Sequence, residues 1–537
     1  MELPARIVKP ALEEVGARGR LTGSRLAVAL SSRRLIAFVM LASVFTMTAG
    51  AIDDPDFWWH LRTGQLIFET RSVPRADVFS FTAHGWGWVT HEWLSEVVMF
   101  ALYRLAGWGG LVAAFSLAMT AALWIVYRRA VRRGAHGYVA CAATLLGALA
   151  TMPIWGVRPQ MFSFLFTSVF LLVLDDYARA CHAGLDRAGA RQRRALWSLI
   201  PLTLVWVNLH GGFALGLGLI VLTGAGVALD GLMSAGAGAG EAAPSGRTWP
   251  RVRRLCFVFA ACAGVVVLNP SGWRLYSYPF ETLNSRAMQK YIVEWFSPDF
   301  HQPYAHALAL LLFATFAALA LSPKRARAGE VLLLCVAAYA ALRAWRNIPF
   351  FALAAAPALA EHGWSLVETH ALARGGAKGR ASGRLTTAQL ALNVALFVCL
   401  PVGLCAAKLA SVARAQASVE AEKFPLAAVE FLRGRADAGP LFNHYGWGGY
   451  LVWKLYPERL VFIDGRADVY GDALLEAYLS AENGEKGWRA TLDKYAVTTV
   501  MIKPGAPLAG LLDEDAGWGK VYDDGQAVIF LRKMKNS

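Results

Sequence analysis

Residues 35–60 read LIAFVMLASVFTMTAGAI followed directly by DDPDFWWH, so a long uncharged run ends in three aspartates, two tryptophans and a histidine. A membrane-spanning helix needs roughly 20 apolar residues, and residues 35–52 therefore predict a span. The composition agrees with a membrane protein, because 56% of the 537 residues are hydrophobic and 17% are charged, whereas soluble domains contain about 25% charged residues.

Eleven apolar stretches lie in the first 407 residues, separated by short polar segments. They cover residues 35–52, 109–127, 138–155, 160–177, 196–208, 213–232, 255–268, 303–321, 331–342, 349–360 and 387–407. Several are short for a straight span, which is tolerated where protein or water covers the backbone. The pattern predicts a polytopic α-helical membrane protein of about eleven spans.

The positive charge follows these stretches. The formal net charge is +15, and a division after residue 407 leaves +16 before it and −1 after it. Counted from a cytoplasmic N-terminus, the inner segments hold 27 Lys and Arg, and the outer loops before residue 407 hold 10. Basic loops face the cytoplasm, so the surplus charge reports orientation rather than nucleic-acid binding. Eleven spans then place the C-terminal residues outside.

The C-terminal part of the chain has a different pattern, in which short β-branched or aromatic runs alternate with helical ones. Strands are predicted at 440–445, 460–465, 497–503 and 526–532, and helices at 424–432, 446–456, 473–481, 488–495 and 507–513. This order predicts a small α/β domain. The predicted organisation is a cytoplasmic N-terminus at 1–34, a spanning region at 35–407 with a large first outer loop at 53–108, and an extracytoplasmic domain at 408–537.

Known cofactor motifs are missing from this sequence. It contains no Gly-x-Gly-x-x-Gly and no phosphate-binding loop, so nucleotide binding is not predicted. The seven cysteines include no Cys-x-x-Cys pair, and neither a zinc site nor a disulfide framework is indicated.

Asp53, Asp54 and Asp56 are the first candidate catalytic residues. Carboxylates crowded at a membrane surface repel one another, which raises a pKa or favours a divalent cation such as Mg²⁺ or Mn²⁺. Either property suits a general base. The structural alternative is that Asp54 caps a helix whose first residue is Pro55.

Further polar residues fall in the outer turns that follow. The candidates for substrate binding are His91, Glu92, Arg158, Asn208, His210, Glu294, Arg343 and Arg346. A single arginine near a membrane commonly extends toward lipid phosphates. Several arginines that converge on an acidic loop instead indicate an anion site, because guanidinium binds phosphate through paired hydrogen bonds.

An acidic Asp54-Pro55-Asp56 motif that opens a large first outer loop, followed by many spans and an outer domain, resembles the GT-C glycosyltransferases. That superfamily includes oligosaccharyltransferase catalytic subunits, protein O-mannosyltransferases, aminoarabinose transferases and rhizobial galacturonosyltransferases. The resemblance implies a polyprenyl-phosphate-linked sugar donor, a bacterial inner-membrane location, and transfer at the outer face to a lipid, polysaccharide or protein. It also implies that Asp54 or Asp56 deprotonates the acceptor or holds a metal. Arg158, Arg343 and Arg346 match no family motif and are candidates for the lipid phosphate by topology alone.

The segment Tyr445-Gly446-Trp447-Gly448-Gly449-Tyr450 resembles the start of the oligosaccharyltransferase outer domain, but it lacks that family's Trp-Trp-Asp-Tyr-Gly motif. Recognition of a peptide sequon is therefore not implied. Asp464 and Arg466 are weaker candidates for acceptor binding, the alternative being an ion pair that closes a turn.

Three other functions are compatible with parts of this sequence. A transporter or flippase of an anionic or lipid-linked substrate usually has ionisable groups near the middle of its spans, whereas Asp175, Asp176 and Asp230 lie at predicted span ends. A surface-polysaccharide polymerase or ligase would share the outer-face residues. A non-catalytic anchor would explain the C-terminal domain but not the polar outer turns.

Overall fold

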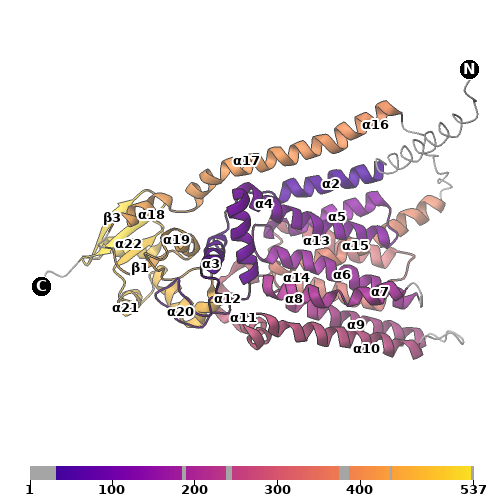
Figure 1. Ribbon diagram of the computed structural model, residues 1–537, viewed down its shortest axis with the longest axis horizontal. Helices are drawn as coiled ribbons and strands as arrows, with labels where there is room; N and C mark the ends of the chain where they lie inside the picture. Colours follow the sequence, from indigo (N-terminus) through magenta and orange to yellow (C-terminus); the bar gives the residue numbers. More distant parts are fainter. Residues whose placement is uncertain (1–31, 184–188, 237–244, 374–385, 436–437, 534–537) are drawn as a thin grey trace, which may run out of the picture.

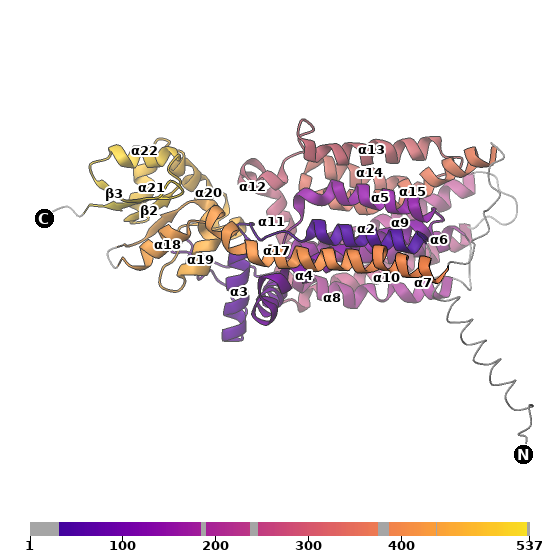
Figure 2. The same cartoon turned by 90° about the horizontal axis from the view of Figure 1, so that it is seen from above.

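Most of the chain forms a bundle of roughly parallel helices, and a small sheet domain lies at one end of it (Figures 1 and 2). The computed structural model describes residues 32–183, 189–236, 245–373, 386–435 and 438–533. We call the end next to the sheet domain the domain-bearing end and the other the basic end. The bundle contains α2 (Ser32–Thr48), α4 (Trp93–Arg132), α5 (Gly137–Thr151), α6 (Gln160–His182), α8 (Leu199–Leu209), α9 (Phe213–Gly236), α10 (Ser245–Gly264), α13 (Pro303–Leu321), α14 (Ala328–Arg343) and α15 (Ile348–Ala373).

Seven helices of the described residues are long and apolar enough to cross a membrane. They are Trp93–Arg132, Gly137–Ile154, Gln160–His182, Phe213–Ser234, Pro303–Leu321, Trp345–Ala371 and Ala388–Lys423. The other four predicted spans fall on α2, α8 and α14, which have 17, 11 and 16 residues, and on α10, whose first half carries arginines and a proline. The fold class is therefore the predicted one, a polytopic helical protein with a small C-terminal sheet domain.

The first loop crosses the domain-bearing end of the bundle. Helix α3 (Phe57–Thr70) lies across the axes of the spanning helices (Figure 1). Helix α4 begins at Trp93 within this loop, and Gly107, with a φ of 60°, separates its first part from the spanning part. Because this positive φ suits glycine, the chain turns there from the membrane surface into the membrane.

The C-terminal domain has a four-stranded sheet in the order β1-β2-β4-β3, in which β1 and β2 are parallel and the other pairs are antiparallel. The strands are β1 (Leu441–Asn443), β2 (Thr499–Ile502), β3 (Trp518–Asp523) and β4 (Val528–Arg532). The helices are α18 (Leu426–Arg433), α19 (Gly448–Leu455), α20 (Ala467–Glu482), α21 (Trp488–Lys494) and α22 (Pro507–Glu514). The strand predicted at 460–465 is wrong, and β3 was not predicted.

Residues 460–465 lie between β1 and the first loop but pair with both only through isolated bridges, and the Asn443 side chain takes up the backbone groups of Phe462 and Ile463. Val461 makes isolated parallel bridges to Leu441 and to Ser80 of the first loop. The Thr82 hydroxyl donates a hydrogen bond to the Phe462 carbonyl. One apolar core runs continuously through the bundle, the loop and the domain, so the first loop and the domain form one packed unit.

Helix α17 (Leu400–Lys423) connects the bundle to the domain along the outside of the molecule (Figure 2). With α16 (Thr387–Val394) it forms an apolar segment that is only 6% buried, and it contacts α2 and α4. The helix continues past the boundary predicted at residue 408 and ends at Lys423, where α18 and the sheet domain follow.

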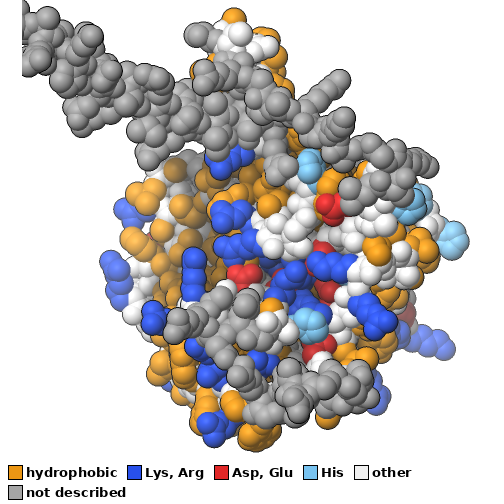
Figure 3. All heavy atoms as spheres, turned by 90° about the vertical axis from the view of Figure 1, so that its right-hand side faces the viewer, with side chains coloured by type: hydrophobic (Ala, Val, Ile, Leu, Met, Phe, Trp, Pro, Cys, Tyr) orange, Lys and Arg blue, Asp and Glu red, His pale blue; other side chains and the backbone are white. Residues whose placement is uncertain are grey.

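The basic end is covered by Lys and Arg side chains, with a few acidic groups near its middle (Figure 3). Arg133 of α4 lies there at 2.8 Å from Asp175 and also pairs with Glu330. Arg179 lies 3.0 Å from Glu361, which Lys324 also contacts. These pairs join α4, α6, α14 and α15.

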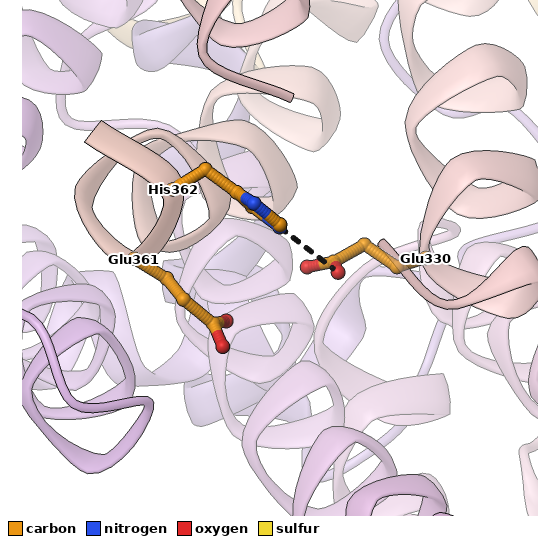
Figure 4. Close-up of side chains that lie close together, drawn as sticks. All are labelled: Glu330, Glu361 and His362. Atoms are coloured by element: carbon orange, nitrogen blue, oxygen red, sulfur yellow. Dashed lines mark ion pairs between the residues drawn. The ribbon is translucent and has the colours of Figure 1, made fainter. Parts of the chain in front are cut away.

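His362 completes this cluster and points toward Glu330, with its Nε2 at 3.6 Å from Glu330 Oε2 (Figure 4). Glu330, Glu361 and His362 are close enough together to hold a metal ion. A divalent cation would, however, compete with Arg133, Arg179 and Lys324 for the same carboxylates. We therefore assign the cluster to helix packing.

Candidate active site

A cavity of about 770 Å³ opens at the domain-bearing end between α2, α4, the turn after α5 and the sheet domain. We call it the large cavity. Its wall within the bundle is apolar and includes Met47, Val112, Phe115, Met119, Met152 and Ile154. Its polar end contains Asp53, Asp54, Asp56, Arg158 and Glu294. The large cavity thus has an apolar wall at one end and a cluster of acidic side chains at the other.

Arg158 lies at the centre of that acidic cluster. Its Nε is 2.8 Å from Asp54 Oδ2, its Nη2 is 3.5 Å from Asp56 Oδ2, and its Nη1 contacts Glu294 Oε1. The three carboxylates come from distant parts of the sequence, the loop after α2 and the short turn η4 (Val293–Trp295). The fold therefore brings together Asp54, Asp56, Arg158 and Glu294, all predicted as site residues.

The electrostatic environment separates the roles of these acids. Burial, together with the neighbouring Asp54 carboxylate, raises the pKa of Asp56 to about 8. Burial also raises the pKa of Asp54, although Arg158 opposes the shift. Burial acts in the same direction on Glu294, but Arg158 outweighs it and lowers the pKa of that carboxyl. Asp56 is consequently the acid that exchanges a proton near neutral pH.

Hydrogen bonds hold the acidic loop from both sides. Asp54 Oδ1 accepts a hydrogen bond of 2.9 Å from the Asp56 amide, just before α3 begins. The Gln416 side chain of α17, which is 1% exposed, donates to the Ile52 carbonyl at 3.0 Å and accepts from the Ile52 amide at 2.9 Å. Asp54 does not cap a helix that starts at Pro55, because α3 begins at Phe57 and has no side-chain cap; Asp54 instead closes a turn with the Asp56 amide and pairs with Arg158.

Two glycines of the domain let it approach this loop. A Cβ added at Gly465 would lie 1.7 Å from Asp56 Oδ1, and one added at Gly449 would lie 2.6 Å from the Pro55 carbonyl oxygen. Real side chains do not tolerate such distances, so glycine is required at both positions. The domain therefore forms a wall directly over Asp56.

A second cavity of about 410 Å³ meets the first at Asp56, Arg158 and Glu294. We call it the histidine cavity, because His60, His91 and His210 line it around Glu92. Glu92 Oε1 lies 3.2 Å from His91 Nε2 and 3.3 Å from His210 Nε2. Glu92 Oε2 lies 3.6 Å from His60 Nδ1.

The protonation state of His210 follows from its neighbours. Its Nδ1 accepts a hydrogen bond of 2.9 Å from the Gly212 amide, which can only donate. Its Nε2 must therefore carry the proton, and it lies 3.3 Å from Glu92 Oε1. Burial lowers the pKa of His210 to about 4, so the ring is neutral. A metal ion would need the Nε2 lone pair that this proton occupies, and His210 is not available as a metal ligand.

The other groups around Glu92 complete an ordered network. Burial lowers the pKa of His60 to about 3. Burial alone would lower the pKa of His91 as well, but Glu92 reverses the shift and raises it. The pKa of Glu92 is lowered, because His91 outweighs the effect of burial. His91 and Glu92, whose pKa values are shifted in opposite directions by each other, thus lie between His60 and His210.

Arg346 lies in the wall of the histidine cavity with its guanidinium free for a ligand. It stacks on Trp295 at 4.4 Å and has no ion pair within 4 Å in the described part of the chain. Tyr278 and Asp468 lie in the same wall, with the tyrosine hydroxyl 3.3 Å from the Asp468 carboxylate.

The remaining predicted residues lie away from this junction. Arg343 is exposed and donates to Gln289 at 3.2 Å, outside both cavities. Asn208 accepts a hydrogen bond from Trp93 at 2.8 Å and supports the start of α4. Asp464 and Arg466 are buried 2.6 Å apart, although Arg466 also lines the histidine cavity. Arg466 contacts Asp77 at 2.7 Å and so ties the domain to the first loop; acceptor binding by this pair stays a prediction.

Sequence reasoning missed His60, Tyr278 and Gln416. His60 is the last residue of the segment 53–60 quoted above, and its place beside the aspartates could have marked it as a site residue. Tyr278 lies in the outer loop that also carries Glu294, but it was not selected as a site residue. Gln416 lies beyond the last predicted span, in a stretch without a motif.

No protein-family model matches the chain, and no curated protein matches its sequence. Among solved structures, the Archaeoglobus fulgidus oligosaccharyltransferase tethered with an acceptor peptide matches with a TM-score of 0.54 and 12% identity, over 94% of this chain and 75% of that one. The oligosaccharyltransferase AglB of the same organism, in complex with an inhibitory peptide and a dolichol-phosphate, gives 0.51 and 12%, over 87% and 69%. ArnT from Cupriavidus metallidurans bound to undecaprenyl phosphate gives 0.47 and 15%, over 93% and 98%. At such identities the likeness concerns the fold alone, which the chain shares with the archaeal oligosaccharyltransferase.

Proposed function

We propose that the protein transfers a sugar from a polyprenyl-phosphate-linked donor to an acceptor at its domain-bearing end. The observation that carries the proposal is the large cavity, in which an apolar wall inside the bundle leads to Asp56. A long isoprenoid chain matches the apolar part, and a reacting sugar matches the acidic end. The likeness to an oligosaccharyltransferase solved with a dolichol-phosphate supports a lipid-linked donor.

Asp56 acts as the general base in this proposal. A base is most effective when its pKa lies close to the working pH, and the pKa of Asp56 is raised to about 8. The carboxylate removes the proton of the acceptor group as that group attacks the anomeric carbon. The bond between this carbon and the phosphate oxygen breaks, and the lipid phosphate leaves with the electron pair.

Arg346 stabilises the negative charge that develops on the leaving phosphate. Its guanidinium lies in the wall of the histidine cavity, which meets the large cavity at Asp56. It has no ion pair in the described residues, and it stacks on Trp295. A fixed cation next to a developing anion lowers the barrier because it needs no reorganisation. Arg158, by contrast, is already shared among three carboxylates.

The test is transfer by the full-length protein in lipid nanodiscs with a panel of undecaprenyl-phosphate-linked sugars and candidate acceptors. Release of undecaprenyl phosphate is measured by mass spectrometry. We expect Asp56→Asn to lower the rate by at least about 100-fold, as loss of a general base does. Asp299→Asn is the matched control, because Asp299 lies in an outer loop, is half-exposed and lines neither cavity.

Full release by the Asp56→Asn protein would contradict the assignment of the base. Elongation of a polysaccharide acceptor in the same assay would identify a polymerase or ligase that uses the same cavity. Movement of the intact lipid-linked donor across the bilayer, without release of phosphate, would instead support a flippase.

A further inference from the structure

The acidic junction of the two cavities contains its own cation. Each of the three guanidinium nitrogens of Arg158 faces a different carboxylate, with Nε toward Asp54, Nη2 toward Asp56 and Nη1 toward Glu294. Arg158 is part of the site rather than of the packed core, because its side chain is 20% exposed and lines both cavities.

A divalent metal ion would use the same carboxylate oxygens. Mg²⁺ and Mn²⁺ bind carboxylate oxygens at about 2.0–2.2 Å, which requires the ligand atoms to converge on one point. In the described ranges, the group that converges in this way is Glu330, Glu361 and His362 at the basic end. At the junction the acids surround Arg158, so the place of a metal ion holds a guanidinium.

We infer that Arg158 is the resident cation of the site and that transfer proceeds without a divalent metal ion. The inference rests on the proposed function, because it concerns how the negative charges of the same carboxylates are balanced during the proposed transfer. Arg158 offsets the repulsion among Asp54, Asp56 and Glu294, so that Asp56 can lose its proton beside two other acids. Its three nitrogens each face a carboxylate, whereas Arg346 has no ion pair in the described residues, and the leaving phosphate therefore pairs with Arg346.

A metal ion added to the intact site would meet two obstacles. It would have to displace Arg158 from Asp54 and Glu294, and it would then lie beside a buried positive charge. Removal of the guanidinium removes both obstacles to metal binding, because three carboxylates are left without a cation between them. Arg158→Ala should therefore create a cation site where the native protein has none.

Mn²⁺ binding to the purified full-length protein, followed by electron paramagnetic resonance, tests this inference without any transfer reaction. We expect Arg158→Ala to bind one more Mn²⁺ than the native protein, at least tenfold more tightly than any native binding at the junction. The additional site should disappear in Arg158→Ala/Glu294→Gln. Arg158→Lys, which keeps the charge, should not gain it.

Arg274→Ala is the matched control, because Arg274 is an exposed arginine at the same end and lines neither cavity. It should bind Mn²⁺ as the native protein does. Native protein that binds Mn²⁺ stoichiometrically and loses it in Asp54→Asn would overturn the inference, and so would Arg158→Ala that gains no site. Native transfer should also persist in EDTA. An inactive native protein with the expected Mn²⁺ pattern would contradict the proposed function alone.

Discussion

At the scale of single residues, the site depends on how differently three neighbouring carboxylates behave. Asp54 and Glu294 contact the guanidinium of Arg158 closely, whereas Asp56 lies 3.5 Å from it. Asp56 is also next to Asp54, whose charge is the second cause, after burial, of its raised pKa. Position along one short loop therefore decides which acid carries the proton.

This difference predicts a pH dependence. The base must be ionised, and the pKa of Asp56 is raised to about 8, so the transfer rate should rise with pH and level off above that value. Below pH 7 the rate should fall about tenfold per pH unit, as the ionised fraction does. Rates measured between pH 6 and 9.5 test this.

The Asp54→Asn variant is the control for the cause of the shift. It removes the negative charge that raises the pKa of Asp56, so the midpoint of its remaining activity should move to lower pH. A rate independent of pH across the range would show that Asp56 is not the base.

The residues of the motif could be selected from the sequence because charges next to an apolar span are unusual. Arg158 and Glu294 were selected as well, but their contact with each other and with the motif could not be predicted in the same way. Arg158 and Glu294 are separated by 136 residues, and their contact depends on how α6 and η4 pack. The role of Arg158 as the centre of an acidic cluster was accordingly absent from the sequence-based prediction, which assigned it to the lipid phosphate.

At the scale of elements, helix α17 has the least expected role. It is almost unburied along the membrane, yet its Gln416 bonds both backbone groups of Ile52, two residues before Asp54. A segment that reads as a final span thus fixes the start of the acidic loop. The apolar pattern predicted a helix there, but a hydrogen bond to a residue 364 positions earlier leaves no trace in that pattern.

Gln416→Leu should loosen the acidic loop while leaving the helix intact. Leucine keeps most of the volume but leaves the Ile52 amide and carbonyl without partners, which costs about 1–3 kcal/mol for each buried group. We expect a lower unfolding temperature in nanodiscs and a reduced transfer rate. Differential scanning calorimetry and the release assay measure these.

Ser418→Leu is the matched control on α17, because Ser418 is exposed and makes no contact with the loop. It should change neither quantity. A Gln416→Leu protein with native rate and stability would show that the loop is fixed by other contacts.

At the scale of the whole molecule, charge asymmetry was the most reliable sequence signal. The described parts of the basic segments predicted to lie inside, such as residues 128–133 at the end of α4, lie at one end of the bundle, and Figure 3 shows Lys and Arg side chains spread over that end. Each of the eleven predicted apolar stretches contains helix. These features depend on local composition, which the sequence displays directly.

The orientation in the membrane is tested by reporter fusions. Fusions after residues 133, 300 and 420 should report cytoplasmic, outer and outer positions, because basic loops stay in the cytoplasm. Alkaline phosphatase and green fluorescent protein fusions give opposite signals on the two sides. A cytoplasmic signal at 420 would place the domain on the wrong side for the proposed reaction.

The joint between the first loop and the domain was beyond sequence reasoning. Thr82 and Phe462 are 380 residues apart, yet they share a hydrogen bond. The segment around Val461 read as an ordinary strand of the domain, and the partner that changed its structure was a loop assigned to the membrane part.

That joint has a consequence for how the protein matures. Asp56 is synthesised long before Gly465, and the two come together only when the later segment docks. Until then, the nascent chain lacks the wall of the large cavity that the domain forms over Asp56. The wall over Asp56 is therefore complete only after the domain has docked on the first loop.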